Sequence, residues 1–218
     1  MCDFSNITDD TPFGYIVDTP EIRGLIDETH RLMAAVESDA ERVKALEPAF
    51  SRLLASDGWL PDAFASPDET SGMGGGIGQY ALYRAEDGSL ALFSLVVPAG
   101  ATTPVHDHQA WGLIGLYRGR QGETVYKRLD DGADPDRADL EVVVDQEVET
   151  GEFFALLPPD GDIHKVTTIS AEPSVSIHLL ANDTGCVWRR RFEPETGVVA
   201  AFRSGYSNGD CPEEEAAD

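Results

Sequence analysis

The stretch "GATTPVHDHQAWGLIGLYRG", Gly100 to Gly119, places His106 and His108 one residue apart, just before a short apolar run. On a β-strand, side chains at positions i and i+2 point to the same face of the sheet. If that face lines the inside of a barrel, the two imidazoles can chelate one metal ion. An isolated pair of this kind is more often exposed on a sheet surface, so the surrounding sequence must decide between the two interpretations.

The rest of the chain predicts mainly β-structure behind two helices. Asp18-Thr19-Pro20-Glu21 is typical of a helix start, and apolar residues at helical spacing continue to Val36. A second helix is predicted from about Asp39 to Leu54. From Gln79 to about Arg203 the sequence reads as about ten short strands separated by turns such as EDG, PAG and DDGADPD, which favours a small antiparallel sandwich or jelly-roll barrel.

This pattern divides the 218 residues into three parts. Residues 1–70 are predicted to be a helical segment packed on the barrel, residues 71–208 the barrel itself, and residues 209–218 an acidic, disordered tail. The three cysteines have no motif spacing, so we expect reduced thiols and no disulfide framework. Because no signal peptide or membrane-spanning run is evident, we expect a cytoplasmic protein, either monomeric or homodimeric.

The charge of the chain is unusual. Forty acidic residues face sixteen basic ones, for a formal net charge of −24, and only three of the bases are lysines. A surface this acidic repels nucleic acid and anionic membranes, so neither is an expected partner. Acidity spread along the chain with scarce lysine fits a halophilic protein from a high-salt cytoplasm, where salt screens the repulsion. An ordinary acidic protein is the alternative.

Two histidine motifs together carry a family resemblance. Gly100, His106, His108 and Gly119 follow the spacing of the first cupin motif. Downstream, "GEFFALLPPDGDIHKVTT" contains Pro159-x-Gly161-x-x-His164, which follows the second. The chain therefore resembles the cupin superfamily. That resemblance implies a double-stranded β-helix barrel in which His106, His108 and His164 bind one metal ion.

One departure from the cupin pattern narrows the resemblance. The glutamate ligand that usually follows the second histidine falls on Gly112 or Leu113, and neither can bind metal. Three-histidine iron is known in the thiol dioxygenases. "TPVHDHQAWGLIGLYRG", "SVSIHLLANDTG" and "SGYSN" resemble the cysteine dioxygenase family, especially its bacterial 3-mercaptopropionate dioxygenase branch. The resemblance implies Fe(II), although three imidazoles also bind nickel, zinc or manganese.

The resemblance also implies further site residues. The family has a Ser-His-Tyr hydrogen-bonded chain near the iron, and its first two members match Ser176 and His178. The tyrosine position holds Leu180, so a phenol that could donate a hydrogen bond is missing. His178 is then either a proton relay or a buried histidine with a structural role.

Recognition of a substrate carboxylate requires a cation, and arginine is favoured because it binds carboxylate in a fork. The mercaptopropionate branch has a glutamine on an early strand, which matches Gln79, and an arginine that falls on Arg189. Arg84 is the alternative cation. Arg189 to Arg191 also alternate between the two faces of their strand, so a register shift of one residue would change the assignment. Trp111 either forms a wall of the substrate pocket or packs in the core.

These residues lead to one principal function and two alternatives. The principal hypothesis is an iron-dependent thiol dioxygenase that oxidises a small thiol carboxylate, such as 3-mercaptopropionate or cysteine, to its sulfinate with O2. One alternative is a cupin dioxygenase or isomerase for a non-thiol substrate. The other is a non-catalytic cupin that binds a metal or a small molecule.

Overall fold

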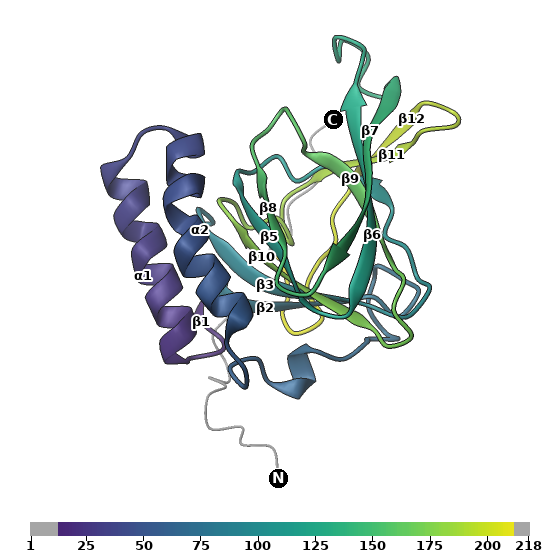
Figure 1. The fold of residues 1–218 in the computed structure, drawn as a ribbon. Helices are drawn as coiled ribbons and strands as arrows, with labels where there is room; N and C mark the ends of the chain where they lie inside the picture. Colours follow the sequence, from purple (N-terminus) through teal and green to yellow (C-terminus); the bar gives the residue numbers. More distant parts are fainter. Residues whose placement is uncertain (1–12, 212–218) are drawn as a thin grey trace.

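The computed structural model describes residues 13–211, and Figure 1 shows two helices beside a β-barrel. Helix α1 spans Pro20–Ala35 and helix α2 spans Asp39–Ala55. The Thr19 side chain caps α1 by accepting a hydrogen bond from the amide of Ile22, while Pro20 occupies the first turn. Ser38 caps α2 in the same way. Both helices therefore lie where the sequence predicts them.

The strands form two antiparallel sheets. The first sheet has the order β1-β2-β3-β10-β5-β8, and the second has the order β12-β11-β4-β9-β6-β7. A short 3-10 helix, Asp62–Phe64, precedes the barrel. The strands are β1 (Gly14–Tyr15), β2 (Gly78–Arg84), β3 (Ala91–Val97), β4 (Val105–His106), β5 (Gly112–Arg118), β6 (Arg120–Arg128), β7 (Leu140–Glu149), β8 (Phe153–Leu156), β9 (Ile163–Thr168), β10 (Ser174–Leu180), β11 (Arg189–Glu193) and β12 (Val198–Phe202).

The pairing of the central strands identifies the architecture. β3 pairs with β10, β4 with β9, β5 with β8 and β6 with β7, all antiparallel. The chain is thus one long hairpin folded over so that each strand of its first half lies against the matching strand of its second half. That nesting is a double-stranded β-helix, or jelly roll. The predicted fold class, a mainly β barrel with N-terminal helices, is confirmed.

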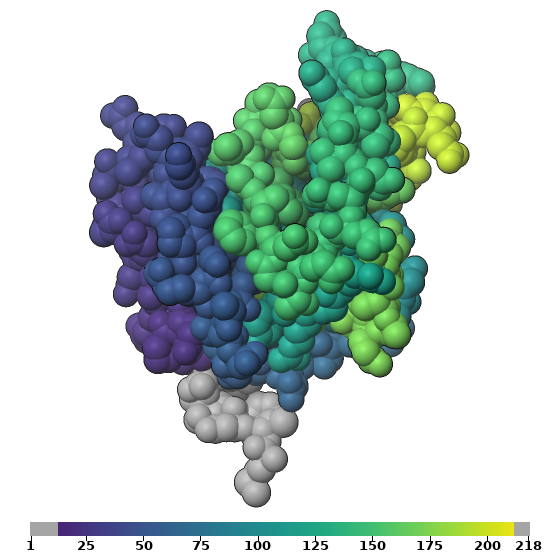
Figure 2. Space-filling view, in the orientation of Figure 1, coloured from purple at the N-terminus to yellow at the C-terminus, as the bar shows by residue number. Residues whose placement is uncertain are grey.

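The helices cover the outer face of the first sheet. Gly115 on β5 has no side chain, and a Cβ there would collide with Leu54 and Phe50 of α2. This close approach buries Phe50 completely within a core cluster that joins the helices to the sheet. Figure 2 shows the helices as a layer beside the barrel, with the β6–β7 hairpin projecting beyond it. Neither helix among residues 13–211 has the combined length and apolar character that crossing a membrane requires.

The prediction of reduced cysteines is wrong for two of them. Cys186 and Cys211 form a disulfide, with their Cα atoms 5.1 Å apart. They meet because the chain after β12 turns back over the loop after β10, a contact between distant segments that cysteine spacing cannot reveal. Residues 209–211 of the predicted tail are thereby tied to the barrel. Residues 212–218 and Cys2 lie outside the described residues.

Candidate metal centre

Three buried histidines meet inside the barrel. His106 ends β4, His164 lies opposite it on β9, and His108 follows β4 after one residue. The ring centroids are 4.8, 5.0 and 4.9 Å apart, and the possible ligand atoms lie within 4.8 Å of one another. The two cupin-like histidine motifs therefore form one group that can hold a metal ion.

The prediction that both histidines of the pair belong to one strand needs a correction. Only His106 lies in β4, because the strand ends there. The amide of His108 leaves the strand ladder and donates instead to the Asp162 carboxylate, at 2.8 Å. Gln109 follows with a φ of 55°. The backbone bends, but the carboxylate of Asp162 holds the bend so that both rings still face the same interior space.

Hydrogen bonds fix which nitrogen of each ring faces that space. Nδ1 of His106 lies 2.9 Å from the carbonyl of Pro104, and Nδ1 of His108 lies 3.2 Å from the carbonyl of Asp162. Nδ1 of His164 lies 3.0 Å from the carboxylate of Glu123. These oxygens only accept, so each Nδ1 carries the hydrogen and each Nε2 keeps its lone pair.

The donor set fits a divalent ion. Burial, and then the neighbouring histidines, lower the pKa values of His106 and His108 well below the usual range, so both rings are neutral. Neutral imidazole is the form that binds metal. Two nitrogens that each lie about 2.1 Å from one ion are at most about 4.2 Å apart, so shifts below about 1 Å complete the set.

The position of the missing glutamate ligand is closed to any side chain. A Cβ at Gly112 would collide with the carbonyl oxygen of Leu179 on the neighbouring strand. Leu113 is buried in the core cluster on the helix side of the sheet. The residues described therefore form a three-histidine group with no carboxylate ligand, as the sequence predicts.

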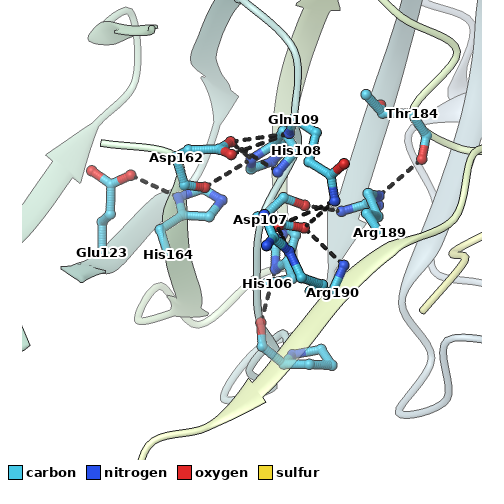
Figure 3. Close-up of polar contacts among 11 residues, drawn as sticks. His106, Asp107, His108, Gln109, Glu123, Asp162, His164, Thr184, Arg189 and Arg190 are labelled. Carbon is cyan, nitrogen blue, oxygen red and sulfur yellow. Dashed lines mark hydrogen bonds and ion pairs between the residues drawn. The ribbon is translucent and has the colours of Figure 1, made fainter. Parts of the chain in front are cut away.

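Three buried carboxylates that the sequence analysis missed support this group. Glu123 on β6 contacts His164, and Asp162 binds the backbone of the His108 loop. Asp107 accepts from the backbone amide and Nε of Arg190, at 2.8 and 2.6 Å, and is completely buried. Figure 3 shows Glu123 beside His164, on the side away from the other two histidines, and Asp107 between the histidines and the arginines. Of these three carboxylates, only Asp107 could have been found from the sequence, because it lies between the two histidines of the motif.

Ser176 and His178 lie on the opposite sheet, on β10. The Ser176 hydroxyl lies 3.0 Å from Nε2 of His178, whose ring stacks on Phe93 and lies 6.3 Å from the ring of His108. Burial lowers the pKa of His178 well below its usual range. Its Nδ1 is buried without a hydrogen-bond partner among the described residues. Leu180 occupies the position where the thiol dioxygenase family has a tyrosine. It packs in an apolar cluster and has no polar group that could bond Nδ1 of His178.

Arg189 is the buried cation beside the histidines. Its Nε donates to the carbonyl of Thr184, Nη1 to the carbonyl of Asp107 and Nη2 to the hydroxyl of Ser204, at 2.8–2.9 Å. All three acceptors are neutral, and burial lowers the pKa of Arg189 to about 10. Three of the five guanidinium N–H groups donate to these acceptors. Within the described structure, Nη1 and Nη2 therefore each have one N–H group without an acceptor.

The structure brings Gln79 to the same place as Arg189. Its Nε2 donates to the Ser204 hydroxyl, at 3.2 Å, so one serine links the two predicted substrate-binding residues. Arg84, the alternative cation, is instead held by Asp183, with Nη2 2.7 Å from the carboxylate.

Trp111 lies elsewhere. It packs against the core cluster on the helix side, where the Arg42 guanidinium lies 5.6 Å from its ring centroid. Of the two sequence interpretations for Trp111, this position favours core packing.

Comparisons with known proteins found several solved structures with a limited likeness to this chain. No protein-family model matches the sequence. The chain is similar to the cupin domain of Cnp3 from Schizosaccharomyces pombe, with 20% identity and a TM-score of 0.36 over 49% of this chain and 61% of that one. A double-stranded β-helix protein from Klebsiella pneumoniae matches at 11% identity and TM-score 0.40, over 56% and 81% of the two chains. A recombinant oxalate oxidase in complex with glycolate matches at 13% identity and a TM-score of 0.41, over 84% of this chain and 72% of that one.

With identities and TM-scores this low, the fold assignment rests on the nested strand pairing and not on these neighbours.

Proposed function

We propose that this protein is an iron(II)-dependent thiol dioxygenase that converts a small thiol carboxylate and O2 to the corresponding sulfinate. The reaction balances without a further reductant, because both oxygen atoms of O2 join one sulfur. When bound, iron would supply the redox chemistry that joins O2 to sulfur. The chain would hold it through Nε2 of His106, His108 and His164.

The observation that carries the proposal is the buried guanidinium of Arg189 beside the three buried imidazoles. A buried charge is costly unless an opposite charge pairs with it. The direct partners of Arg189 among the described residues are all neutral oxygens. A substrate carboxylate would give the guanidinium a direct anionic partner, and the two remaining N–H groups could bind it in a fork. The other end of a short substrate would then lie toward the histidines.

The remaining residues orient the substrate and handle its proton. In the proposed reaction the thiol proton must leave the sulfur. His178 has an unpartnered Nδ1 and a hydrogen-bonded Nε2, so its neutral ring can accept a hydrogen bond from the thiol at Nδ1 while Nε2 donates to Ser176. Gln79 acts through Ser204 on the carboxylate end. The strongly acidic sequence supports, as part of the proposal, a salt-rich environment that screens the repulsion between its charges.

A panel of thiols tests the proposal. Iron-loaded protein is incubated in air with 3-mercaptopropionate, cysteine, mercaptosuccinate and cysteamine, and oxygen uptake and sulfinate are measured. The carboxylate thiols should turn over faster than cysteamine, which has no carboxylate for Arg189. Oxygen uptake without sulfinate from any thiol would contradict the proposal.

A metalloenzyme for a non-thiol carboxylate is the second candidate. It is favoured by Leu180, because this leucine removes the phenol that the thiol dioxygenase family has next to its histidine. Turnover of a carboxylate without a thiol, with no thiol-dependent oxygen uptake, would support this candidate over the first.

A further inference from the structure

The segment Ser204–Cys211, here called the clasp, runs back across the first sheet after β12. Its backbone is held at several points along its length. The amide of Gly205 donates to the carbonyl of Gly185, at 2.8 Å, and the Asn208 side chain bonds both the amide and the carbonyl of Ala81, at 2.8 and 2.9 Å. The clasp is therefore an ordered part of the barrel wall, although it contains no strand of either sheet.

Ser204 is the residue through which the clasp reaches the site. Its hydroxyl oxygen accepts from Nη2 of Arg189, at 2.8 Å, and from Nε2 of Gln79, at 3.2 Å. A serine oxygen has two lone pairs and one O–H. Both lone pairs are occupied, and no described residue accepts from the hydroxyl hydrogen. The Ser204 O–H is thus a buried donor next to the two remaining N–H groups of Arg189.

The disulfide joins the two segments that hold Arg189. Cys186 belongs to the loop in which the carbonyl of Thr184 accepts from Nε of Arg189. Cys211 ends the clasp, whose Ser204 accepts from Nη2. Between these points the hydroxyl of Tyr206 donates to Asp183 of the same loop, at 2.7 Å. The crosslink therefore closes a ring of contacts around the guanidinium.

We propose that Ser204 is a carboxylate-binding residue that also positions Arg189, and that the Cys186–Cys211 disulfide locks the clasp that presents it. The inference rests on the proposed function, because it assigns Ser204 to the carboxylate end of the same substrate. Arg189 and Ser204 together offer three donors to one carboxylate, and Gln79 fixes the serine from the other side.

The test of Ser204 compares two ligands that differ only in the carboxylate. Binding of 3-mercaptopropionate and of 1-propanethiol to the iron-loaded protein is measured by calorimetry without oxygen. Ser204→Ala should weaken 3-mercaptopropionate by about tenfold or more and leave 1-propanethiol unchanged, because only the carboxylate loses a donor. Ser204→Thr keeps the hydroxyl and should restore most of the affinity. Ser51→Ala, on the exposed side of α2, is the matched control.

Unchanged discrimination between the two ligands in Ser204→Ala would overturn the assignment. A crystal structure of that variant provides a second readout that needs no ligand. In that structure Arg189 should have lost its hydrogen bond to the carbonyl of Asp107 or to that of Thr184. An unmoved guanidinium would overturn the role of Ser204 in positioning Arg189. Failure of the proposed function gives a different result, namely wild-type protein that binds the carboxylate but forms no sulfinate.

The lock is tested with Cys211→Ser, which removes the crosslink without adding a reductant that could itself bind the site. Amide hydrogen exchange of Gly205 and Ser207 should become faster, and the preference for 3-mercaptopropionate should fall. Cys2→Ser is the control, because Cys2 is outside the disulfide. Unchanged exchange in Cys211→Ser would overturn the lock, and so would peptide mass mapping that finds free thiols at both Cys186 and Cys211 of the wild-type protein.

Discussion

The carboxylate of Glu123 lies 3.0 Å from Nδ1 of His164, on the side of the ring away from the other two histidines. Both side chains are buried, and Nε2 of Gln146 holds the second carboxylate oxygen at 2.9 Å. A carboxylate in this position fixes the hydrogen on Nδ1 and makes Nε2 a stronger ligand. Glu123 would therefore act, through His164, on a metal ion held at this site.

Replacing Glu123 should weaken metal binding. Glu123→Gln removes the negative charge, and we expect the affinity for iron or zinc to fall about 10- to 100-fold. Competition with a chromogenic chelator measures this change. His164→Ala should lose most of the metal and gives the lower limit, while Glu141→Gln, exposed on β7, is the control. Equal affinity in Glu123→Gln and wild type would contradict the role given to the carboxylate.

Arg189→Ala should raise the KM for thiol carboxylates. Removing one partner of a buried ion pair costs about 3–5 kcal/mol, which corresponds to a hundredfold or more. Steady-state kinetics should show this for 3-mercaptopropionate, with little change for cysteamine. Arg191→Ala, an exposed residue on the same strand, controls for the loss of one positive charge.

Arg84 should behave differently from Arg189. Because Arg84 pairs with the buried Asp183, Arg84→Ala should mainly lower the melting temperature. If Arg189→Ala leaves all carboxylate thiols unaffected while Arg84→Ala raises their KM, the roles of the two arginines are reversed.

Leu180 gives a paired prediction. Leu180→Tyr would introduce near His178 the phenol that thiol dioxygenases have, and under the proposed function it should raise the rate on 3-mercaptopropionate, by up to about 10²- to 10⁴-fold if the missing proton donor limits that rate. Leu180 is fully buried, so the larger ring should also cost about 1–3 kcal/mol of stability. Leu180→Phe carries the ring without the hydroxyl. Equal rates in the Tyr and Phe variants would show that the hydroxyl is not what the site lacks.

Salt should stabilise the fold. Forty acidic residues outnumber sixteen basic ones, and the excess negative charges repel one another over a screening length of about 30 Å at 0.01 M salt, which falls to about 3 Å at 1 M. We expect the melting temperature to rise steeply between dilute buffer and molar potassium chloride. Calorimetry at a series of salt concentrations measures this, and a flat response would remove the inference of a high-salt environment.

The sequence predicts the fold and the metal group well, because both depend on local patterns. Helix caps, apolar periodicity and turn residues define the elements, and two spaced motifs bring His106, His108 and His164 together. Gln79 and Arg189 were found only through a family resemblance, and the structure does place them on the same serine.

The supporting residues could not be predicted because their contacts join distant parts of the chain. Glu123 and Asp162 resemble the other acidic residues of a very acidic sequence, and only burial sets them apart. The pairing of Cys186 with Cys211 depends on where the clasp folds back. Trp111 lies in the irregular segment between β4 and β5, so alternation along a strand does not predict that its side chain packs on the helix side of the sheet.

Oxidation of 3-mercaptopropionate under ¹⁸O₂ by the iron-loaded protein tests the central claim most directly. Mass spectrometry of the product should show a sulfinate in which both oxygen atoms on sulfur carry the label. The label should disappear together with the product in His164→Ala. A disulfide as the only thiol product, or a sulfinate with oxygen derived from water, would contradict the assignment of this site as a thiol dioxygenase.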